Sequence, residues 1–401
     1  MVKNIIRLSQ SDIGDQEKKA VLKVLDKGYL GMGEEVKQFE NLLKTFFDRE
    51  VACVSSGTAA IQLALEACNI GAGDEVLVPS LTYVATFQAI SATGATPIAC
   101  DVDNESLIID IRDASRKISK STRAIIPVYY TGGVGDIEAI YKFAADNKLR
   151  IIEDAAHAFG STFNNKKIGS FGDISCFSFD GIKNITSGEG GCIVTNDLKV
   201  INSIKDKRLL GVINDSEKRY LGERSWSFDV EFQGWRYHMS NIMASIGIVQ
   251  LKRFNEFSEK RKNYARLYDS LFKNNTCINF VNRDYNSVVP HIYVVKINGK
   301  IGVEEVKNKM LDFNIQTGVH YFPNHLLSFY NKGESLKVTE SVYQKILTLP
   351  LHTNLAEGDV KFIASKTIRS LTDPDDSTAN FIAAKVSKFG ASKTAIKSYC
   401  P

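Results

Sequence analysis

Apolar positions along this chain change their spacing near residue 50. Between residues 13 and 48 they recur every three or four positions, which predicts two amphipathic helices separated by the glycine-rich stretch 27–33. One apolar stripe comprises Val21, Leu22, Val24 and Leu25, and the other comprises Val36, Phe39, Leu42, Leu43 and Phe46.

Beyond residue 50, short runs rich in Val and Ile alternate with helical segments. Such runs are typical of the buried strands of a parallel sheet that helices cover on both faces. The predicted strands are 51–55, 75–80, 96–102, 123–130, 150–155, 174–179 and 190–196. The predicted helices among them are 58–68, 82–93 and 136–147. The spacing therefore favours a large α/β domain over roughly residues 50–250.

A long helical pattern over 236–275 leads into a smaller C-terminal α+β unit. In that unit the pattern predicts a strand over 291–297 and a helix over 303–313, and the sequence turns polar and irregular after residue 371. We therefore expect N-terminal helices and a large domain over 1–250, a small domain over 251–371 and a polar extension over 372–401.

Composition places the chain among ordinary globular proteins. Of its 401 residues 44% are apolar and 24% are charged, so there is enough apolar surface to bury, and disorder throughout the chain is excluded. Fifty basic and 46 acidic residues leave a net charge of +4, which is no footprint for nucleic acid.

The cysteines and histidines indicate neither disulfides nor a metal site. Seven Cys occur without any CxxC pair, which favours reduced thiols, and the six His show no ligand spacing for zinc. The N-terminus lacks an apolar signal region, and the longest uncharged stretch, 76–100, is interrupted by Pro79, Gly94 and Pro97. We expect a cytoplasmic protein that has no membrane span and binds no metal.

Polar residues follow several predicted strands, at the sheet edge where ligands of α/β proteins bind. Ser55, Ser56, Gly57 and Thr58 lie between a strand and a helix, where backbone N–H groups suit a phosphate, although Ser or Thr there is more often a plain N-cap. Asp154 ends another strand and could pair with a protonated ring nitrogen, although a capping or salt-bridging role is the commoner one.

A lysine and an aromatic residue complete the set of candidate site residues. Lys183 is flanked by apolar residues and followed by a glycine-rich turn, so its amine could be desolvated and nucleophilic, or it could extend to solvent. Tyr83 could cover a planar ring or pack in the core. Together a phosphate cradle, a stacking ring, an acid and a buried lysine are the parts that hold pyridoxal phosphate (PLP).

With these motifs in this order, the chain resembles the DegT/StrS family of nucleotide-sugar aminotransferases over about residues 13–370. The resemblance implies an α/β fold of the aspartate-aminotransferase type (fold type I), with a large PLP-binding domain whose mostly parallel sheet lies between helices, and a small α+β C-terminal domain. The matching stretches are GYLGMGEEVKQFE (28–40), SSGTAAIQLAL (55–65), GDEVLVPSLTYVAT (73–86), IIEDAAHAFGS (151–161), CFSFDGIKNITSGEGGCIVTND (176–197), GWRYHMSNIMASIG (234–247), GVHYFPNH (318–325) and LTLPLH (347–352).

The resemblance assigns roles by position. It implies that Lys183 is the Schiff-base lysine and the acid/base, that Asp154 pairs with the pyridinium nitrogen, and that Tyr83 stacks on the ring. The remaining implied residues are His157 near the ring hydroxyl, Gly57, Thr58 and Ser178 at the cofactor phosphate, and Gly31, His320 and Tyr321 at the substrate.

Three positions depart from the family pattern. Asp180 stands where relatives commonly have His, and His238 replaces an Arg that faces the substrate. Arg236 replaces an Asn that reaches the phosphate of the neighbouring subunit, and a guanidinium can bind that phosphate as well, although a surface salt bridge is the alternative. The resemblance therefore implies a homodimer with shared active sites.

The resemblance implies amine transfer from L-glutamate, through the pyridoxamine phosphate form of the cofactor, to a nucleotide-linked keto-deoxysugar. We expect a dTDP-4-keto-6-deoxyhexose to become a 4-amino-4,6-dideoxy sugar, of the kind found in the O-antigen of lipopolysaccharide. Open alternatives are a 3-keto sugar, a PLP-dependent sugar dehydratase, which Lys183 disfavours, and a non-catalytic PLP-binding regulator.

Overall fold

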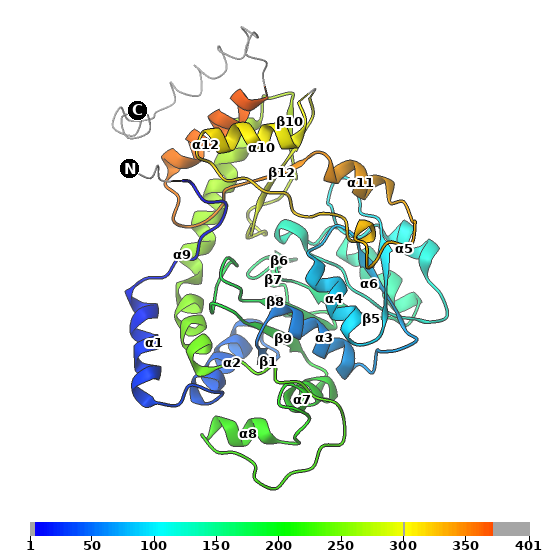
Figure 1. Ribbon diagram of the computed structural model, residues 1–401, viewed down its shortest axis with the longest axis vertical. Coiled ribbons are helices and arrows are strands. Elements are labelled where there is room, and N and C mark those ends of the chain that lie inside the picture. The colour runs from blue at the N-terminus through cyan, green and yellow to red at the C-terminus, as the bar shows by residue number, and fades with distance from the viewer. Residues whose placement is uncertain (1–4, 300, 372–401) are drawn as a thin grey trace.

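The computed structural model describes residues 5–299 and 301–371, and its centre is a seven-stranded sheet in the order β1-β9-β8-β5-β4-β2-β3 (Figure 1). The strands of this sheet are β1 (Glu50–Val54), β2 (Glu75–Pro79), β3 (Thr96–Cys100), β4 (Thr122–Ile125), β5 (Arg150–Asp154), β8 (Ile174–Ser178) and β9 (Gly191–Thr195). A separate short hairpin pairs β6 (Thr162–Phe163) with β7 (Lys166–Lys167). The predicted α/β class is confirmed.

One strand of this mostly parallel sheet runs in the opposite direction. All neighbouring pairs from β8 to β3 are parallel, whereas β9 is antiparallel to both β8 and β1. The cause is the connection between β8 and β9, which covers residues 179–190 and contains no helix. Parallel neighbours need a crossover, usually helical, so this chain simply turns back.

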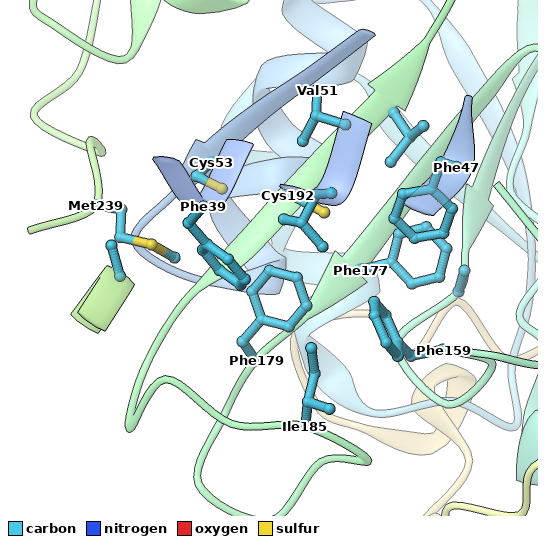
Figure 2. Packing of buried hydrophobic residues seen from close by; sticks show 14 of the residues in the cluster. Phe39, Phe47, Val51, Cys53, Phe159, Phe177, Phe179, Ile185, Cys192 and Met239 are labelled. Carbon is cyan, nitrogen blue, oxygen red and sulfur yellow. The ribbon is translucent and has the colours of Figure 1, made fainter. Parts of the chain in front are cut away.

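Helices cover both faces of the sheet, and successive strand residues are buried on opposite sides. In β8, Cys176 packs with α3, α4 and α7, whereas Phe177 packs with α2 and α9. On the second side, the Phe177 ring is stacked on that of Phe47 and lies edge-on to that of Phe159 (Figure 2). This burial of both faces explains why the strands are apolar runs without alternation.

The helices of this part of the chain differ from their predicted ranges mainly at the ends. They are α1 (Asp15–Lys27), α2 (Glu34–Phe47), α3 (Gly57–Ala67), α4 (Val84–Ala92), α5 (Ile111–Lys117), α6 (Ile137–Asp146), α7 (Leu198–Lys207) and α8 (Asp215–Tyr220). In α1 the predicted apolar stripe is only partly buried, because Leu22 and Leu25 are about half exposed.

A second sheet, β10-β11-β12, lies at the other end of α9 (Asn241–Phe272), which runs past both sheets (Figure 1). The strands of this sheet and the helices that follow α9 are β10 (Ile278–Phe280), β11 (Tyr293–Ile297), α10 (Val303–Asp312), α11 (Lys337–Tyr343), β12 (Ile346–Leu349) and α12 (Glu357–Ser370). The predicted domain division at residue 250 falls inside α9 and stays a prediction, and the predicted extension 372–401 lies outside the described residues.

The predicted helix over 236–275 begins too early. Residues 235–238 are extended, because the Tyr237 carbonyl accepts a hydrogen bond from the Ser55 backbone N–H at 2.7 Å and His238 bridges to Val54. The helix starts only after Ser240, whose hydroxyl caps it by accepting from the Met243 N–H. This extended segment brings residues 235–238 to the end of β1.

A buried ion pair ties the helices around β1 together. Arg208, which follows α7 and is fully buried, donates to Glu40 of α2 at 2.5 Å and to the Cys53 carbonyl of β1 at 2.7 Å. Tyr220 of α8 donates to the other Glu40 oxygen. Every charge of the pair is therefore met by several hydrogen bonds, as burial requires.

We expect Glu40→Ala to lower the free energy of unfolding by about 3–5 kcal/mol, because it leaves the buried Arg208 guanidinium without its counter-charge. Urea unfolding of the two proteins measures the loss. The control is Lys142→Ala, which removes an exposed Lys142–Asp146 pair and should cost less than about 1 kcal/mol. Equal effects of the two changes would contradict the stabilising role of the Glu40 network.

Candidate active site

A cavity of about 510 Å³ lies at the carboxyl ends of β5 and β8, beside the N-termini of α3 and α4. It gathers nine of the eleven residues that the sequence singled out. They are Gly57, Thr58, Tyr83, Asp154, His157, Ser178, Lys183, His320 and Tyr321. The motifs that are far apart in the sequence therefore meet at one edge of the sheet.

Lys183 projects from the turn that connects β8 and β9. Two neighbours in this turn are anchored to the core: the Asn184 amide donates to the Phe159 carbonyl at 3.2 Å, and the Thr186 N–H donates to Gln250 at 3.3 Å. Ile185 between them is buried. The turn is thus fixed on the side of the core, and it presents Lys183 to the cavity.

Burial of the Lys183 ammonium lowers its pKa, and the negative charges of Asp154 and Asp180 oppose that effect in part. The net direction is downward, which increases the share of neutral amine near neutral pH. A neutral amine is the form that can attack a carbonyl carbon or accept a proton. The alternative, a lysine that extends to solvent, is not what the structure shows.

Asp154 ends β5 and is buried, with the cavity on one side. Its Oδ2 accepts a hydrogen bond from the Thr86 hydroxyl at 2.7 Å, and its Oδ1 accepts from the Ala156 N–H at 3.2 Å. Burial raises the pKa of Asp154 above its usual value, and these two donors and the charge of Lys183 oppose that rise in part. The carboxylate is therefore placed to meet a positively charged group in the cavity.

The N-terminus of α3 approaches the end of β8 so closely that only glycine fits at position 57. A Cβ there would lie 2.9 Å from the Cβ of Ser178. Ser56 caps the helix by accepting from the Ala59 N–H at 3.1 Å. The N–H groups of Gly57 and Thr58 have no acceptor within the helix, because they lie in its first turn. These two N–H groups and the hydroxyls of Thr58 and Ser178 form a cradle that suits a phosphate.

Aromatic and imidazole side chains form the rest of the wall. Tyr83 is 60% exposed, which excludes the core-packing role, and its ring lies 5.6 Å from that of Tyr321. The Tyr321 hydroxyl is 2.9 Å from His157 Nε2, while His157 Nδ1 is buried and has no hydrogen-bond partner among the described residues. Burial lowers the pKa of His157 well below its usual range, and burial together with the Lys183 charge lowers that of His320 to about 4.

Two residues singled out in the sequence lie outside this cavity in the single chain. Gly31 is exposed, and its carbonyl accepts from the Asn241 N–H at the start of α9. Arg236 is exposed as well and makes no side-chain hydrogen bond or ion pair with the described residues, so the surface salt bridge is not formed. His238 is partly buried, and its pKa falls to about 4 because of burial and the nearby Arg236 charge.

The structure adds residues that the sequence reasoning missed. Thr86, Cys176 and Glu189 line the cavity, and Thr86 contacts Asp154 directly. Thr82 and Asp180, for which the sequence predicts no role in the site, line it too. The spacing of Thr82 and Thr86, four residues apart at a helix start, was the available signal. The described residues contain no cluster of His, Cys, Asp or Glu that could hold a metal ion, and no described helix is long and apolar enough to span a membrane.

The donor set fits PLP. The cradle at Gly57 suits its phosphate, the exposed Tyr83 ring its pyridine face, the buried Asp154 its ring nitrogen, and Lys183 its aldehyde carbon. Fold and site thus define a PLP-dependent enzyme with the aminotransferase fold. The chain belongs to the DegT/DnrJ/EryC1/StrS aminotransferase family, whose sequence profile matches residues 11–367.

Relatives and solved structures support this assignment along most of the chain. GDP-perosamine synthase of Escherichia coli O157:H7 is 35% identical over 363 residues, which are 89% of this chain and 96% of the relative. The dTDP-4-dehydro-2,3,6-trideoxy-D-glucose 4-aminotransferase of Saccharopolyspora spinosa is 29% identical and covers 90% and 96%. The PLP form of the putative sugar aminotransferase Spr1654 from Streptococcus pneumoniae matches with a TM-score of 0.83, at 28% identity, over 96% of this chain and 100% of that one.

The shifted pKa of Lys183 predicts how the apoprotein captures its cofactor. Only the neutral amine attacks the cofactor aldehyde, so the capture rate should rise with pH and level off below the ordinary lysine value of 10.5. Asp180→Asn removes a charge that raises the Lys183 pKa, and the midpoint should therefore move to lower pH. Stopped-flow absorbance over a pH series measures the rates.

The matched control is Asp146→Asn on the exposed end of α6, which should leave the midpoint in place. An upward shift for Asp180→Asn, or a midpoint at or above 10.5 in the unaltered protein, would contradict the electrostatics of the cavity.

Proposed function

We propose that this protein transfers an amino group from L-glutamate to the 4-keto carbon of a nucleotide-linked 6-deoxyhexose, with a dTDP sugar as the first candidate. The observation that carries the proposal is the meeting of Lys183 and Asp154 in one cavity of a sugar-aminotransferase fold. The product would be a 4-amino-4,6-dideoxy sugar.

The residues of the chain have separate tasks in this reaction. When bound, PLP supplies a conjugated ring that carries the amino group and withdraws electrons from the reacting carbon. Lys183 Nζ, as a neutral amine, accepts the proton from that carbon and returns it elsewhere. Asp154, as a buried carboxylate, keeps the ring nitrogen protonated, and the donors at Gly57 and Thr58 bind the phosphate.

The nucleotide and the amination site are the finer part of the proposal. Among relatives, a 4-aminotransferase named for a dTDP sugar and a synthase named for a GDP sugar both align over most of the chain. The GDP sugar is therefore the second candidate. A 3-keto sugar, dehydration and a cofactor-binding regulator are the remaining alternatives, and the presence of Lys183 in the cavity favours amine transfer over dehydration.

The charges in the cavity favour a site shared by two chains. Besides Lys183, the described residues that line it include no lysine and no arginine, although both PLP and a nucleotide diphosphate carry negative charge. Arg236 lies on the surface, two residues before His238, which bridges to Val54 of β1, and its side chain makes no hydrogen bond or ion pair with the described residues. We therefore propose a homodimer in which Arg236 reaches the cofactor phosphate of the other chain.

A substrate panel tests the proposed reaction. We expect L-glutamate to bleach the visible band of the bound cofactor, and a dTDP-4-keto-6-deoxyhexose to restore it with formation of an amino sugar, as mass spectrometry would detect. GDP-linked and 3-keto sugars should restore the band at least about 10-fold more slowly, since each misplaced group costs polar contacts. Faster turnover of a GDP-linked or a 3-keto sugar would overturn the preferred substrate. In the Lys183→Ala variant, the visible band of the bound cofactor should be absent.

Mixed dimers test the shared site. Lys183→Ala and Arg236→Ala chains should each be inactive as homodimers, Arg236→Ala because its cofactor phosphate loses a charge-assisted contact. A heterodimer of the two contains one site with both residues intact if Arg236 acts across the interface, so activity should return in part.

The control for Arg236→Ala is Arg224→Ala, which alters an exposed arginine of the preceding loop and should leave cofactor affinity unchanged. No recovery of activity in verified heterodimers, or unchanged cofactor affinity of Arg236→Ala, would count against the assignment.

A further inference from the structure

Thr82, Thr86 and Asp154 form a continuous chain of hydrogen bonds at the floor of the cavity. The Thr82 and Thr86 hydroxyl oxygens lie 3.0 Å apart, and the Thr86 hydroxyl lies 2.7 Å from Asp154 Oδ2. The two threonines are at most 2% exposed and Asp154 is 6% exposed, so water does not compete with these bonds. The proposed reaction gives the two hydroxyls no task.

The direction of the chain follows from counting hydrogens. A hydroxyl has one hydrogen to donate, and an ionised carboxylate only accepts. Thr86 donates to Asp154, and Thr82 must therefore be the donor in its bond with Thr86. Bonds aligned in this way polarise one another, so Thr82 strengthens the bond between Thr86 and Asp154.

Both threonines are held by the backbone around them. Thr86 lies in the first turn of α4, where its N–H bonds to the Tyr83 carbonyl at 3.2 Å. The Thr82 carbonyl accepts from the Asn324 amide at 2.7 Å, and the same amide donates to the Ser80 carbonyl at 3.1 Å. The hydroxyl donors are thus fixed in place before any ligand binds.

The task that this arrangement can perform is to orient and ionise the carboxylate. Thr86 is the one described side chain that donates to Asp154, and the remaining protein donor is a backbone N–H at 3.2 Å. Burial alone favours the neutral acid, whereas a donated hydrogen bond favours the ion that a protonated ring nitrogen requires.

We propose that Thr82 and Thr86 are positioning residues that hold the Asp154 carboxylate ionised and correctly oriented for the cofactor ring, an inference that rests on the proposed PLP-dependent reaction. Thr86 acts directly, and Thr82 acts through Thr86. Replacement of Thr86 should therefore weaken the cofactor site through Asp154 and through no other group.

The test compares purified holoenzymes by cofactor titration and by the rate at which L-glutamate bleaches the visible band. Thr86→Val keeps the shape but removes the donor, and we expect about 10-fold or more loss in cofactor affinity or in bleaching rate, the effect of one charge-assisted bond. Thr86→Ser should restore both to within about 3-fold, because it returns the donor. Thr82→Val should produce a smaller loss in the same direction.

Thr339→Val is the matched control. Thr339 is fully buried and donates to Asp101 at 2.7 Å, the same bond at the same distance, but it lies in α11 outside the cavity. It should leave both measurements unchanged. In an Asp154→Asn background, Thr86→Val should cause no further loss, because the group it acts through is already altered.

The proposal is overturned if Thr86→Val behaves like Thr339→Val, or if its loss persists undiminished in the Asp154→Asn background. Should Thr86→Val fail to fold, the serine and Thr82→Val variants decide: a Thr82→Val protein equal to the unaltered one overturns the relay. All these measurements use cofactor and L-glutamate alone, so a wrong sugar in the proposed function would leave them unchanged.

Discussion

The active site depends on two opposite charges that stabilise each other, the buried Asp154 carboxylate and the partly buried Lys183 ammonium. Burial lowers the pKa of Lys183 and raises that of Asp154, so each group alone would tend toward its neutral form. The charge of each opposes that tendency in the other. In the proposed reaction Lys183 must exchange protons, whereas Asp154 must stay ionised. Their surroundings differ accordingly. Asp154 accepts two hydrogen bonds, whereas no described acceptor bonds to the Lys183 amine.

The sheet brings these two groups together through one irregularity in its topology. Asp154 ends a parallel strand, β5, and Lys183 follows the next strand, β8, in a turn that leads back into the antiparallel β9. A helical crossover after β8 would have carried the chain away over one face. The short return keeps the turn at the carboxyl edge, where Asn184 and Thr186 fix it to the core on the side away from the cavity.

The sequence predicts the strands well because both faces of the sheet are buried, and uninterrupted apolar runs such as 51–55 and 174–179 signal this clearly. It predicts the start of the long helix wrongly, since Tyr237 and His238 bond to the end of β1, a tertiary contact that no local pattern records. Asp154 and Lys183 are each ambiguous by residue type, and only the set of motifs selected them. The sequence does not predict a role for Thr86, because a threonine is common in the first turn of an ordinary helix.

Gly31 and Arg236 lie outside the cavity of their own chain. The cavity is lined by Asp154, Asp180 and Glu189 against the single cation Lys183, yet its expected ligands are a phosphate and a sugar-nucleotide diphosphate. Free N–H groups at α3 offset part of that deficit, but they carry only partial charge. In the proposed homodimer, the exposed Arg236 guanidinium, which makes no side-chain hydrogen bond or ion pair with the described residues, would supply the missing charge to the cavity of the other chain. The overall charge of +4 is consistent with this view, because a few placed cations shared between chains bind such anions without a basic surface.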